Sequence, residues 1–116
     1  MVWPANTVGS PHDHMTWGVV AVAEGELDIV NYRRDDDGSV SGKAVLHERE
    51  RFTGKTGGIG YVLPPHEDIH EISNRGTRQA ISIHTYGRDI RRCHAFDLKT
   101  GDVKFVDLAY HNESGA

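Results

Sequence analysis

Four histidines and a tyrosine, grouped in three short segments, are the residues of this chain best suited to chemistry. The segments are His12-Asp13-His14, Ile69-His70 and Ser82-Ile83-His84-Thr85-Tyr86. Side chains on a β-strand alternate between two faces, so two histidines one residue apart point to the same side. A third histidine from a distant strand can complete a three-nitrogen face around a divalent ion. We therefore predict a metal site formed by His12, His14 and His70.

The donor set limits the metal only in part. Three neutral imidazoles suit Fe(II), and they also suit Zn, Ni or Mn, because nitrogen ligands alone do not select among these ions. With three protein ligands, an octahedral ion keeps three positions open. Up to three further ligands could occupy these positions together.

The orientation of four further polar side chains follows from strand alternation. Asp13 should point away from its two histidine neighbours, so we expect it to be a hydrogen-bond acceptor and not a ligand. Ser82, His84 and Tyr86 should share one face of a late strand. Hydrogen bonds from Ser82 to His84 and from His84 to Tyr86, here called the relay, would set the direction in which the phenol donates. The phenol could then hydrogen-bond to oxygen or substrate. Taken singly, His84 would more often be a structural polar residue and Tyr86 an aromatic lining residue.

Short extended segments dominate the rest of the chain. Thirteen glycines and four prolines interrupt it, and the pieces between them are rich in β-branched and aromatic residues. The expected strands cover residues 17–23, 27–33, 44–52, 60–63, 70–73, 80–86, 94–97 and 103–107, with loops at 35–41 and 54–58. Strands of this size, repeated about every 8–12 residues, favour an all-β sandwich or barrel. We expect one domain over residues 1–109 and a flexible C-terminal tail over residues 110–116.

Composition restricts the class of protein. The chain has 116 residues, of which 37% are hydrophobic, and this suits one compact domain with a modest core. The net charge is −4, and only Arg88, Arg91 and Arg92 cluster in sign, with Asp89 among them. A nucleic-acid interface would need a basic stripe, so we expect no nucleic-acid partner.

Cysteine content and hydropathy indicate the compartment. Cys93 is the single cysteine, so no disulfide can form within the chain, and a reducing cytoplasm is the simpler interpretation. No apolar stretch approaches the ~18 residues of a membrane helix. The N-terminus also lacks the layout of a signal peptide. We expect a cytoplasmic protein that is not bound to a membrane.

The remaining distinctive side chains are expected to be structural. His66 follows a diproline and His47 lies in a polar segment, so both should be exposed. His94 adjoins Cys93, but no second pair completes a zinc site, so we expect a structural histidine beside a packed thiol. Trp3 and Trp17 are expected in the core.

The spacing around the first histidine pair resembles the first motif of the cupin superfamily, whose members are small double-stranded β-helix barrels. That motif reads His-x-His, three or four residues, Glu, six residues, Gly. Here His14 is followed by three residues, then Gly18, and after six more residues Gly25. Gly18 therefore stands where the usual fourth ligand, a glutamate, would be. A carboxylate would fill a metal position and add negative charge, so its absence leaves room for an anionic sulfur ligand.

The second cupin motif is also similar. It reads Gly, five residues, Pro-x-Gly, two residues, His, three residues, Asn. Gly58 and Pro64 keep their interval, as do His70 and Asn74. His66 occupies the place of the inner glycine, and one extra residue lies between Pro64 and His70. The resemblance implies a single-domain, jelly-roll-like cupin barrel.

A three-histidine cupin without the glutamate resembles the thiol dioxygenases, particularly the cysteine dioxygenase family. That family carries a Ser-x-His-x-Tyr segment beside its iron, and Ser82, His84 and Tyr86 match it in order and spacing. The resemblance covers about residues 3–97. It implies an Fe(II)-dependent enzyme that oxidises a small thiol, of cysteine or mercapto-acid type, to its sulfinate with O2. The implied metal ligands are His12, His14 and His70, and the implied catalytic residues are Tyr86, His84 and Ser82.

Two features depart from the family pattern. Animal enzymes of the family have a cysteine shortly after the histidine pair that crosslinks to the active-site tyrosine, and residues 15–20 contain none. The cysteine-specific enzymes bind the substrate carboxylate with an arginine well upstream of the pair, and the eleven residues before His12 include no arginine. The chain is a fragment, a shorter relative, or a protein that holds its substrate otherwise. Arg33, Arg88 and Arg91 are the alternative partners for a carboxylate.

Two other functions fit the same residues. One is a metal-binding cupin without oxygenase activity, acting as a sensor or small-ligand module, which the missing upstream arginine favours. The other is a three-histidine cupin dioxygenase that acts on a non-thiol substrate such as a diketone. In either case a homodimer is possible, because small cupins often pair through edge strands that need covering.

Overall fold

The computed structural model describes residues 1–108, and all of the regular elements in this part of the chain are β-strands. They are β1 (Val2–Trp3), β2 (Gly18–Glu24), β3 (Glu26–Arg34), β4 (Leu46–Lys55), β5 (Ile59–Val62), β6 (Ile69–Ser73), β7 (Ala80–Tyr86), β8 (Arg92–Phe96) and β9 (Val103–Asp107). The predicted all-β class is confirmed. Within the described residues no helix is long and apolar enough to cross a membrane.

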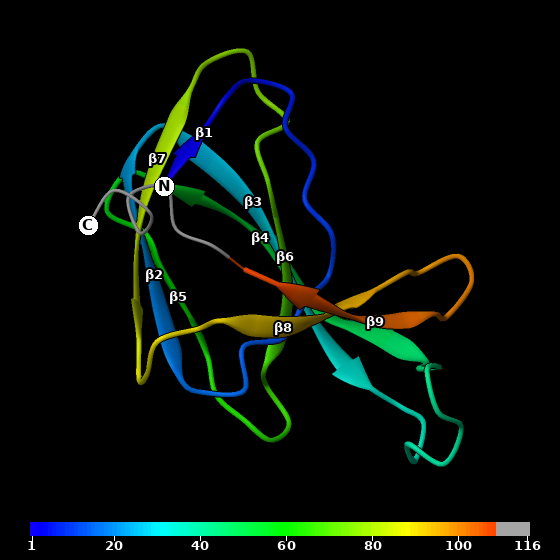
Figure 1. Ribbon diagram of the computed structural model, residues 1–116. Helices are drawn as coiled ribbons and strands as arrows, with labels where there is room; N and C mark the ends of the chain where they lie inside the picture. Colours follow the sequence, from blue (N-terminus) through cyan, green and yellow to red (C-terminus); the bar gives the residue numbers. More distant parts are fainter. Residues whose placement is uncertain (109–116) are drawn as a thin grey trace.

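The strands form two antiparallel sheets and a separate hairpin. The first sheet has the order β1-β7-β2-β5, and the second has the order β4-β3-β6. Figure 1 shows the two sheets facing each other, with the β8–β9 hairpin running crosswise to their strands. This arrangement agrees with the predicted jelly-roll-like cupin barrel. The neighbours in the first sheet are distant in sequence, so the fold brings Val2 and Trp3 alongside Ala80 and Ile81.

Alternating apolar residues explain how the sheets pack. Val20 and Val22 on β2 are buried, whereas Ala21 between them is only partly covered. Leu27 and Ile29 on β3 repeat this pattern from the other sheet. These four residues form one core cluster with Ile72 and Ala80, and Trp3 and Phe52 pack against it. Side-chain alternation thus leaves one face of each sheet to form the core.

The β2–β3 connection depends on a glycine. Gly25 has a φ of +79°, a left-handed conformation that residues with a Cβ rarely adopt. A Cβ at this position would also lie 2.9 Å from the backbone oxygen of Gln79. The tight turn lets β2 and β3 diverge at once into different sheets, and it lies in the gap between the strands predicted at 17–23 and 27–33.

Several predicted boundaries are wrong. The predicted loop at 54–58 begins too early, because β4 continues to Lys55 and Gly54 pairs with Leu27. β1 was not predicted, since a two-residue strand carries no periodicity. Trp17 was expected in the core but is 48% exposed where the chain enters β2. The predicted tail at 110–116 lies outside the described residues.

The outer face of the first sheet is apolar. Ile59 and Tyr61 on β5 and Ile83 on β7 are all more than half exposed. β2 lies between these two strands, since Ala21 pairs with both Ile59 and Ile83. The predicted homodimer stays a prediction.

Candidate metal centre

The three histidines predicted to bind a metal lie together. Their ring centroids are 4.8 Å apart for His12 and His14, 4.9 Å for His12 and His70, and 4.5 Å for His14 and His70. One ligand nitrogen from each ring lies within 4.8 Å of the others. His14 and His70 are each 3% exposed, whereas His12 is half-buried. The cluster could hold a metal ion and has one side nearer to solvent.

The His12–His14 segment is not a regular strand, although strand alternation was the reason for placing its two histidines on one side. His12 forms only isolated bridges, one to His70 and one to Ala95. Its amide donates to the His70 carbonyl at 3.0 Å and its carbonyl accepts from the His70 amide at 3.1 Å. The chain then leaves the extended conformation at Met15, whose φ is +58°. One bridge between His12 and His70 is enough to join the two histidine motifs directly.

Asp68 fixes the orientation of His14 and was not predicted from the sequence. Its Oδ1 accepts from the His14 amide at 3.1 Å, and its Oδ2 accepts from the Met15 amide at 2.9 Å. The His14 Nδ1 lies 3.1 Å from the Asp68 carbonyl oxygen and 3.2 Å from Oδ1. Only an Nδ1–H can donate to these oxygens, so Nε2 carries the lone pair. The one sequence signal was an acid two residues before a candidate ligand.

The tautomer of His12 is fixed in the same way, and two of the clustered Nε2 atoms are buried without a partner among the described residues. The His12 Nδ1 donates to the Ser10 carbonyl at 2.9 Å, so its Nε2 also carries the lone pair. The Nε2 atoms of His14 and His70 are buried without a hydrogen-bond partner among the described residues. Buried polar atoms are normally paired, so such unpaired imidazole nitrogens fit a bound cation.

Burial also prepares the histidines for metal binding. Desolvation lowers the pKa of His12, against the opposing effect of its hydrogen bond to Ser10. Desolvation lowers the pKa of His70 well below its usual value, and the neighbouring histidines act in the same direction. Neutral imidazole is the form that ligates metals. These two rings are therefore in the binding form at neutral pH.

Asp13 points away from the cluster, as predicted, and accepts hydrogen bonds. Its carboxylate accepts from the His94 amide and from the His94 Nδ1, both at 2.7 Å. The Asp13 amide in turn donates to the His94 carbonyl at 3.1 Å. The His94 ring packs against Phe105, with centroids 4.0 Å apart. Asp13 thus attaches the β8–β9 hairpin to the segment that carries two of the three histidines.

The predicted relay is present on β7. Ser82 is fully buried, and its Oγ lies 2.6 Å from the His84 Nε2. The His84 Nδ1 lies 3.0 Å from the Tyr86 hydroxyl. The Tyr86 ring stacks on His14, with centroids 5.6 Å apart and an interplanar angle of 24°. Burial lowers the pKa of His84 to about 4, so this ring is neutral at neutral pH.

Gly18 makes room for the phenol. It pairs with Tyr86 between β2 and β7. A Cβ at Gly18 would lie 2.7 Å from the Cδ1 and 2.9 Å from the Cε1 of Tyr86, and 3.2 Å from a methyl group of Val62. The ring of Tyr86 therefore lies where a side chain at position 18 would begin. The position that holds a glutamate in the first cupin motif here faces a tyrosine from the neighbouring strand.

Two of the three candidate arginines already have carboxylate partners. Arg33 pairs with Asp35 at 3.2 Å, and Arg91 pairs with Asp89 at 2.7 Å. Both guanidinium groups are largely exposed, as is Arg88. The structure assigns neither Arg33 nor Arg91 to the histidine cluster.

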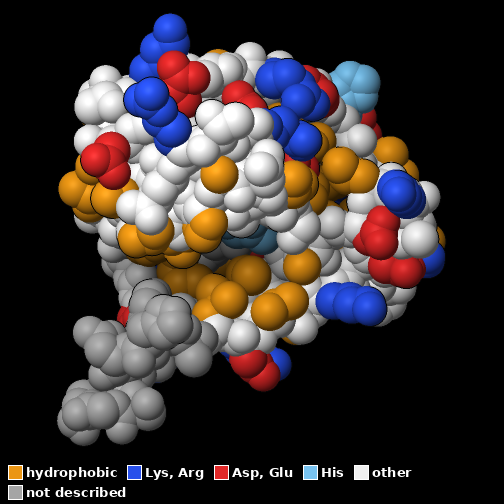
Figure 2. Space-filling view, turned by 90° about the horizontal axis from the view of Figure 1, so that it is seen from above, with side chains coloured by type: hydrophobic (Ala, Val, Ile, Leu, Met, Phe, Trp, Pro, Cys, Tyr) orange, Lys and Arg blue, Asp and Glu red, His pale blue; other side chains and the backbone are white. Residues whose placement is uncertain are grey.

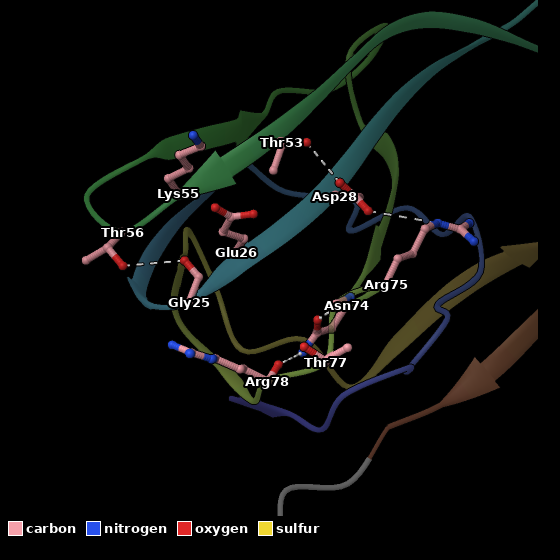
Figure 3. Close-up of a pocket in the computed structure, with 11 residues that line it drawn as sticks. Gly25, Glu26, Asp28, Thr53, Lys55, Thr56, Asn74, Arg75, Thr77 and Arg78 are labelled. Atoms are coloured by element: carbon pink, nitrogen blue, oxygen red, sulfur yellow. Dashed lines mark hydrogen bonds and ion pairs between the residues drawn. The ribbon is translucent and has the colours of Figure 1, made fainter.

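The histidine cluster does not coincide with the cavity of about 520 Å³ at the start of β3. This cavity lies between the start of β3, the end of β4 and the 74–78 loop, and it contains the Asp28–Arg75 ion pair (Figure 3). None of the three clustered histidines lines it. Figure 2 shows a different hollow, bordered by hydrophobic side chains, with a histidine side chain visible inside it. The clustered rings and their orphaned nitrogens define the candidate site, because they supply the donor chemistry.

Fold and site together define a small antiparallel β-barrel with a three-histidine cluster and a Ser-His-Tyr relay beside it. The chain matches the family model for cysteine dioxygenase type I over residues 1–99. The chain belongs to this family, and the predicted family membership is confirmed.

Characterised relatives share only part of their length with this chain. The cysteine dioxygenases type 1 of Rattus norvegicus, Mus musculus and Homo sapiens are each 35% identical to it over 48 residues. That stretch is 40% of this chain and 24% of each relative. The matched stretch thus spans about a quarter of these relatives.

Proposed function

We propose that this protein is a thiol dioxygenase that oxidises a small thiol, of cysteine or mercapto-acid type, to its sulfinate. The reaction would be RSH + O2 → RSO2H, in which both oxygen atoms are transferred to sulfur and no further reductant is needed. The observation that carries the proposal is the histidine cluster, with two buried and unpaired Nε2 atoms, beside the relay. Membership of the cysteine dioxygenase type I family supports it.

Fe(II) is the metal that we propose, held by His12, His14 and His70. When bound, iron would supply the redox chemistry that allows O2 to react with a thiol. The chain contributes three imidazole nitrogen donors and no carboxylate at position 18. Two of the donors are oriented through their Nδ1–H groups by Ser10 and Asp68. Zn, Ni and Mn also accept such a donor set, so direct analysis must identify the ion.

The proposed role of Tyr86 follows from its position. Its ring stacks on His14, and its hydroxyl is held by His84. A phenol in this position is suited to donate a hydrogen bond to the substrate or to oxygen beside the histidines. His84 and Ser82 act through the phenol, since they contact it in series along β7.

The first experiment is metal analysis of protein purified without oxygen, followed by O2 uptake with a panel of thiols and one diketone. We expect about one iron per chain and O2 consumption only with a thiol, because the three donors form one site. Bound metal without uptake on any compound would contradict the dioxygenase proposal. Uptake with the diketone alone would replace the thiol with a different substrate class.

The relay has a separate test in His84→Gln and Tyr86→Phe. We expect turnover to fall by about 100-fold, the usual effect of removing a positioned proton donor, while iron content stays constant. Thr85→Val is the matched control, because Thr85 lies on β7 between these residues and is exposed. Equal losses of metal and turnover would contradict a catalytic role for the pair.

One observation favours a second candidate function, a metal-binding cupin without oxygenase activity. Arg33 and Arg91, two of the candidate partners for a substrate carboxylate, are engaged with aspartates. A module that binds a metal or a small ligand would need no carboxylate partner at this place. This function requires that the protein retains its metal and consumes no O2 with the thiols or the diketone.

A further inference from the structure

Trp3 makes a direct hydrogen bond to the relay, although it lies 79 residues away in sequence. Its indole Nε1 donates to the Ser82 Oγ at 2.7 Å. β1 pairs with β7 through Val2 and Ile81 and through Trp3 and Ala80, which brings the indole alongside Ser82. The ring packs against the core cluster and lies 6.4 Å, between centroids, from the ring of His84. The donor is thus held by a strand on one side and by the core on the other.

This hydrogen bond restricts what the Ser82 hydroxyl can do. An indole N–H can only donate, so the Ser82 oxygen must accept from Trp3. Ser82 is fully buried, and within residues 1–108 the other polar atom bonded to its Oγ is the His84 Nε2, at 2.6 Å. If this Nε2 carried a hydrogen, the serine hydroxyl would be buried without an acceptor, which is costly. The serine O–H therefore points at the His84 Nε2.

The direction of hydrogen-bond donation at Ser82 also fixes the donors further along β7, as far as the phenol of Tyr86. With Nε2 as the acceptor, a neutral His84 carries its hydrogen on Nδ1. Nδ1–H donates to the Tyr86 oxygen at 3.0 Å. The single O–H of Tyr86 is consequently directed away from His84. The ring of His14 stacks on the same phenol, so the hydroxyl lies beside the histidine cluster.

We propose that Trp3 is a positioning residue that sets the donor direction of the relay. The direction runs from the Trp3 indole to Ser82, then to His84, and then to Tyr86. This keeps His84 in the Nδ1–H form and keeps Tyr86 as a donor. The inference rests on the relay having its proposed role beside the metal, but it does not depend on which thiol is the substrate.

The first test is the tautomer of His84 in metal-free protein, read from the 15N signals of its ring. Trp3→Phe removes the N–H and keeps an aromatic ring in the core. We expect the wild type to show a protonated Nδ1, and the variant to shift toward the Nε2–H form, because Ser82 can then accept from His84. His84→Gln assigns the signals, and Trp17→Phe, which alters a half-exposed tryptophan, should leave them unchanged.

The second test is a double-mutant cycle in metal-loaded protein. Trp3→Phe should lower kcat about fivefold, the equivalent of one net hydrogen bond, at unchanged KM and metal content. Adding it to Ser82→Ala should cause no further loss, because both residues act through one chain of contacts. Additive losses, or a His84 spectrum identical in wild type and Trp3→Phe, would overturn the proposal.

A third variant covers poor folding of Trp3→Phe. Replacing Trp3 with β-(3-benzothienyl)alanine keeps the shape of the indole and changes its N–H to sulfur, so only the donor is lost. We expect the same tautomer shift, and an unshifted tautomer would overturn the proposal. Because the tautomer is read without metal or substrate, it remains measurable even if the protein has no dioxygenase activity.

Discussion

Residues 11–14 and strand β7 both bring histidines to the candidate site, but different forces hold them. β7 lies between β1 and β2 with backbone hydrogen bonds on both sides, and alternation alone points Ser82, His84 and Tyr86 the same way. Residues 11–14 have only isolated bridges. Two aspartates fix this segment instead, one binding His94 and the other His14. Side chains two residues apart thus lie on one side in both regions, but for two different reasons.

The comparison has an energetic consequence. A regular strand shares its stability among many ladder hydrogen bonds, so one side chain can change without moving the backbone. The His12–His14 segment depends on a few hydrogen bonds to carboxylates, which are stronger than neutral ones. We expect single substitutions to affect metal binding through this segment and turnover through β7.

The largest effect should come from His14→Ala. Loss of one of three nitrogen donors should lower metal affinity by on the order of 100-fold or more, since even residues that only orient a ligand can cost that much. The fold should persist, because β2 and β7 retain their pairing. Competition titration with a metal-binding dye measures the effect, and exposed His66→Ala is the control. Unchanged affinity in His14→Ala would mean that the cluster is not the metal site.

Asp68→Asn should have the next largest effect. The amide keeps the shape of the carboxylate but places a donor opposite a backbone N–H, either that of His14 or that of Met15. We expect metal affinity to fall by about 10- to 100-fold, because the ligand loses its fixed orientation. Its neighbour Glu67, changed to Gln, is the matched control. If Asp68→Asn bound metal as tightly as the wild type, the claim that carboxylate hydrogen bonds hold the His12–His14 segment in place would be contradicted.

Gly18→Ala tests the β7 side of the comparison. The added Cβ conflicts with the ring of Tyr86, so the phenol must shift by a fraction of an ångström. We expect turnover to fall about tenfold with unchanged metal content, because misplacement of a reacting group is costly. Gly60→Ala is the control, since Gly60 lies in the same sheet and its Cβ would meet Phe52 at an ordinary 3.5 Å. O2 uptake and metal analysis separate the two effects.

The smallest expected effect is the pH dependence of stability in metal-free protein. Desolvation lowers the folded-state pKa of His12 and His70, and it lowers that of His84 to about 4 from the ordinary 6.5. Below pH 6.5 the unfolded chain therefore binds more protons than the folded chain. Their stabilising contribution is complete above pH 6.5 and is lost as the pH falls toward the folded values.

Thermal unfolding measures this loss and divides it between the two regions. We expect Tm to fall by at least about 5 °C from about pH 7.5 to about pH 5. His84→Gln should remove the share of the pH slope that belongs to β7, whereas exposed His66→Gln should keep the full slope. A Tm that rises on acidification would contradict the assigned direction of these pKa shifts.

Much of the candidate site was predictable because its signals are local. Side chains two residues apart share a face in any strand, so the common face of Ser82, His84 and Tyr86 could be predicted. Three histidines in two motifs indicate a metal site without any knowledge of how the strands pair. Asp13 was expected to point away from its neighbours and does so. Trp17 was misplaced because an apolar residue before a strand does not reveal whether anything covers it.

Residue types and strand period are fixed along the chain, so they were enough to predict the all-β class, the three clustered histidines and the order of residues in the relay. The contacts by which Asp68 orients His14 and Trp3 donates to Ser82 arise only when the chain folds. The first contact joins residues that are 54 positions apart in sequence, and the second joins residues that are 79 positions apart. Their existence depends on which strands pair, and pairing is settled by packing the whole core.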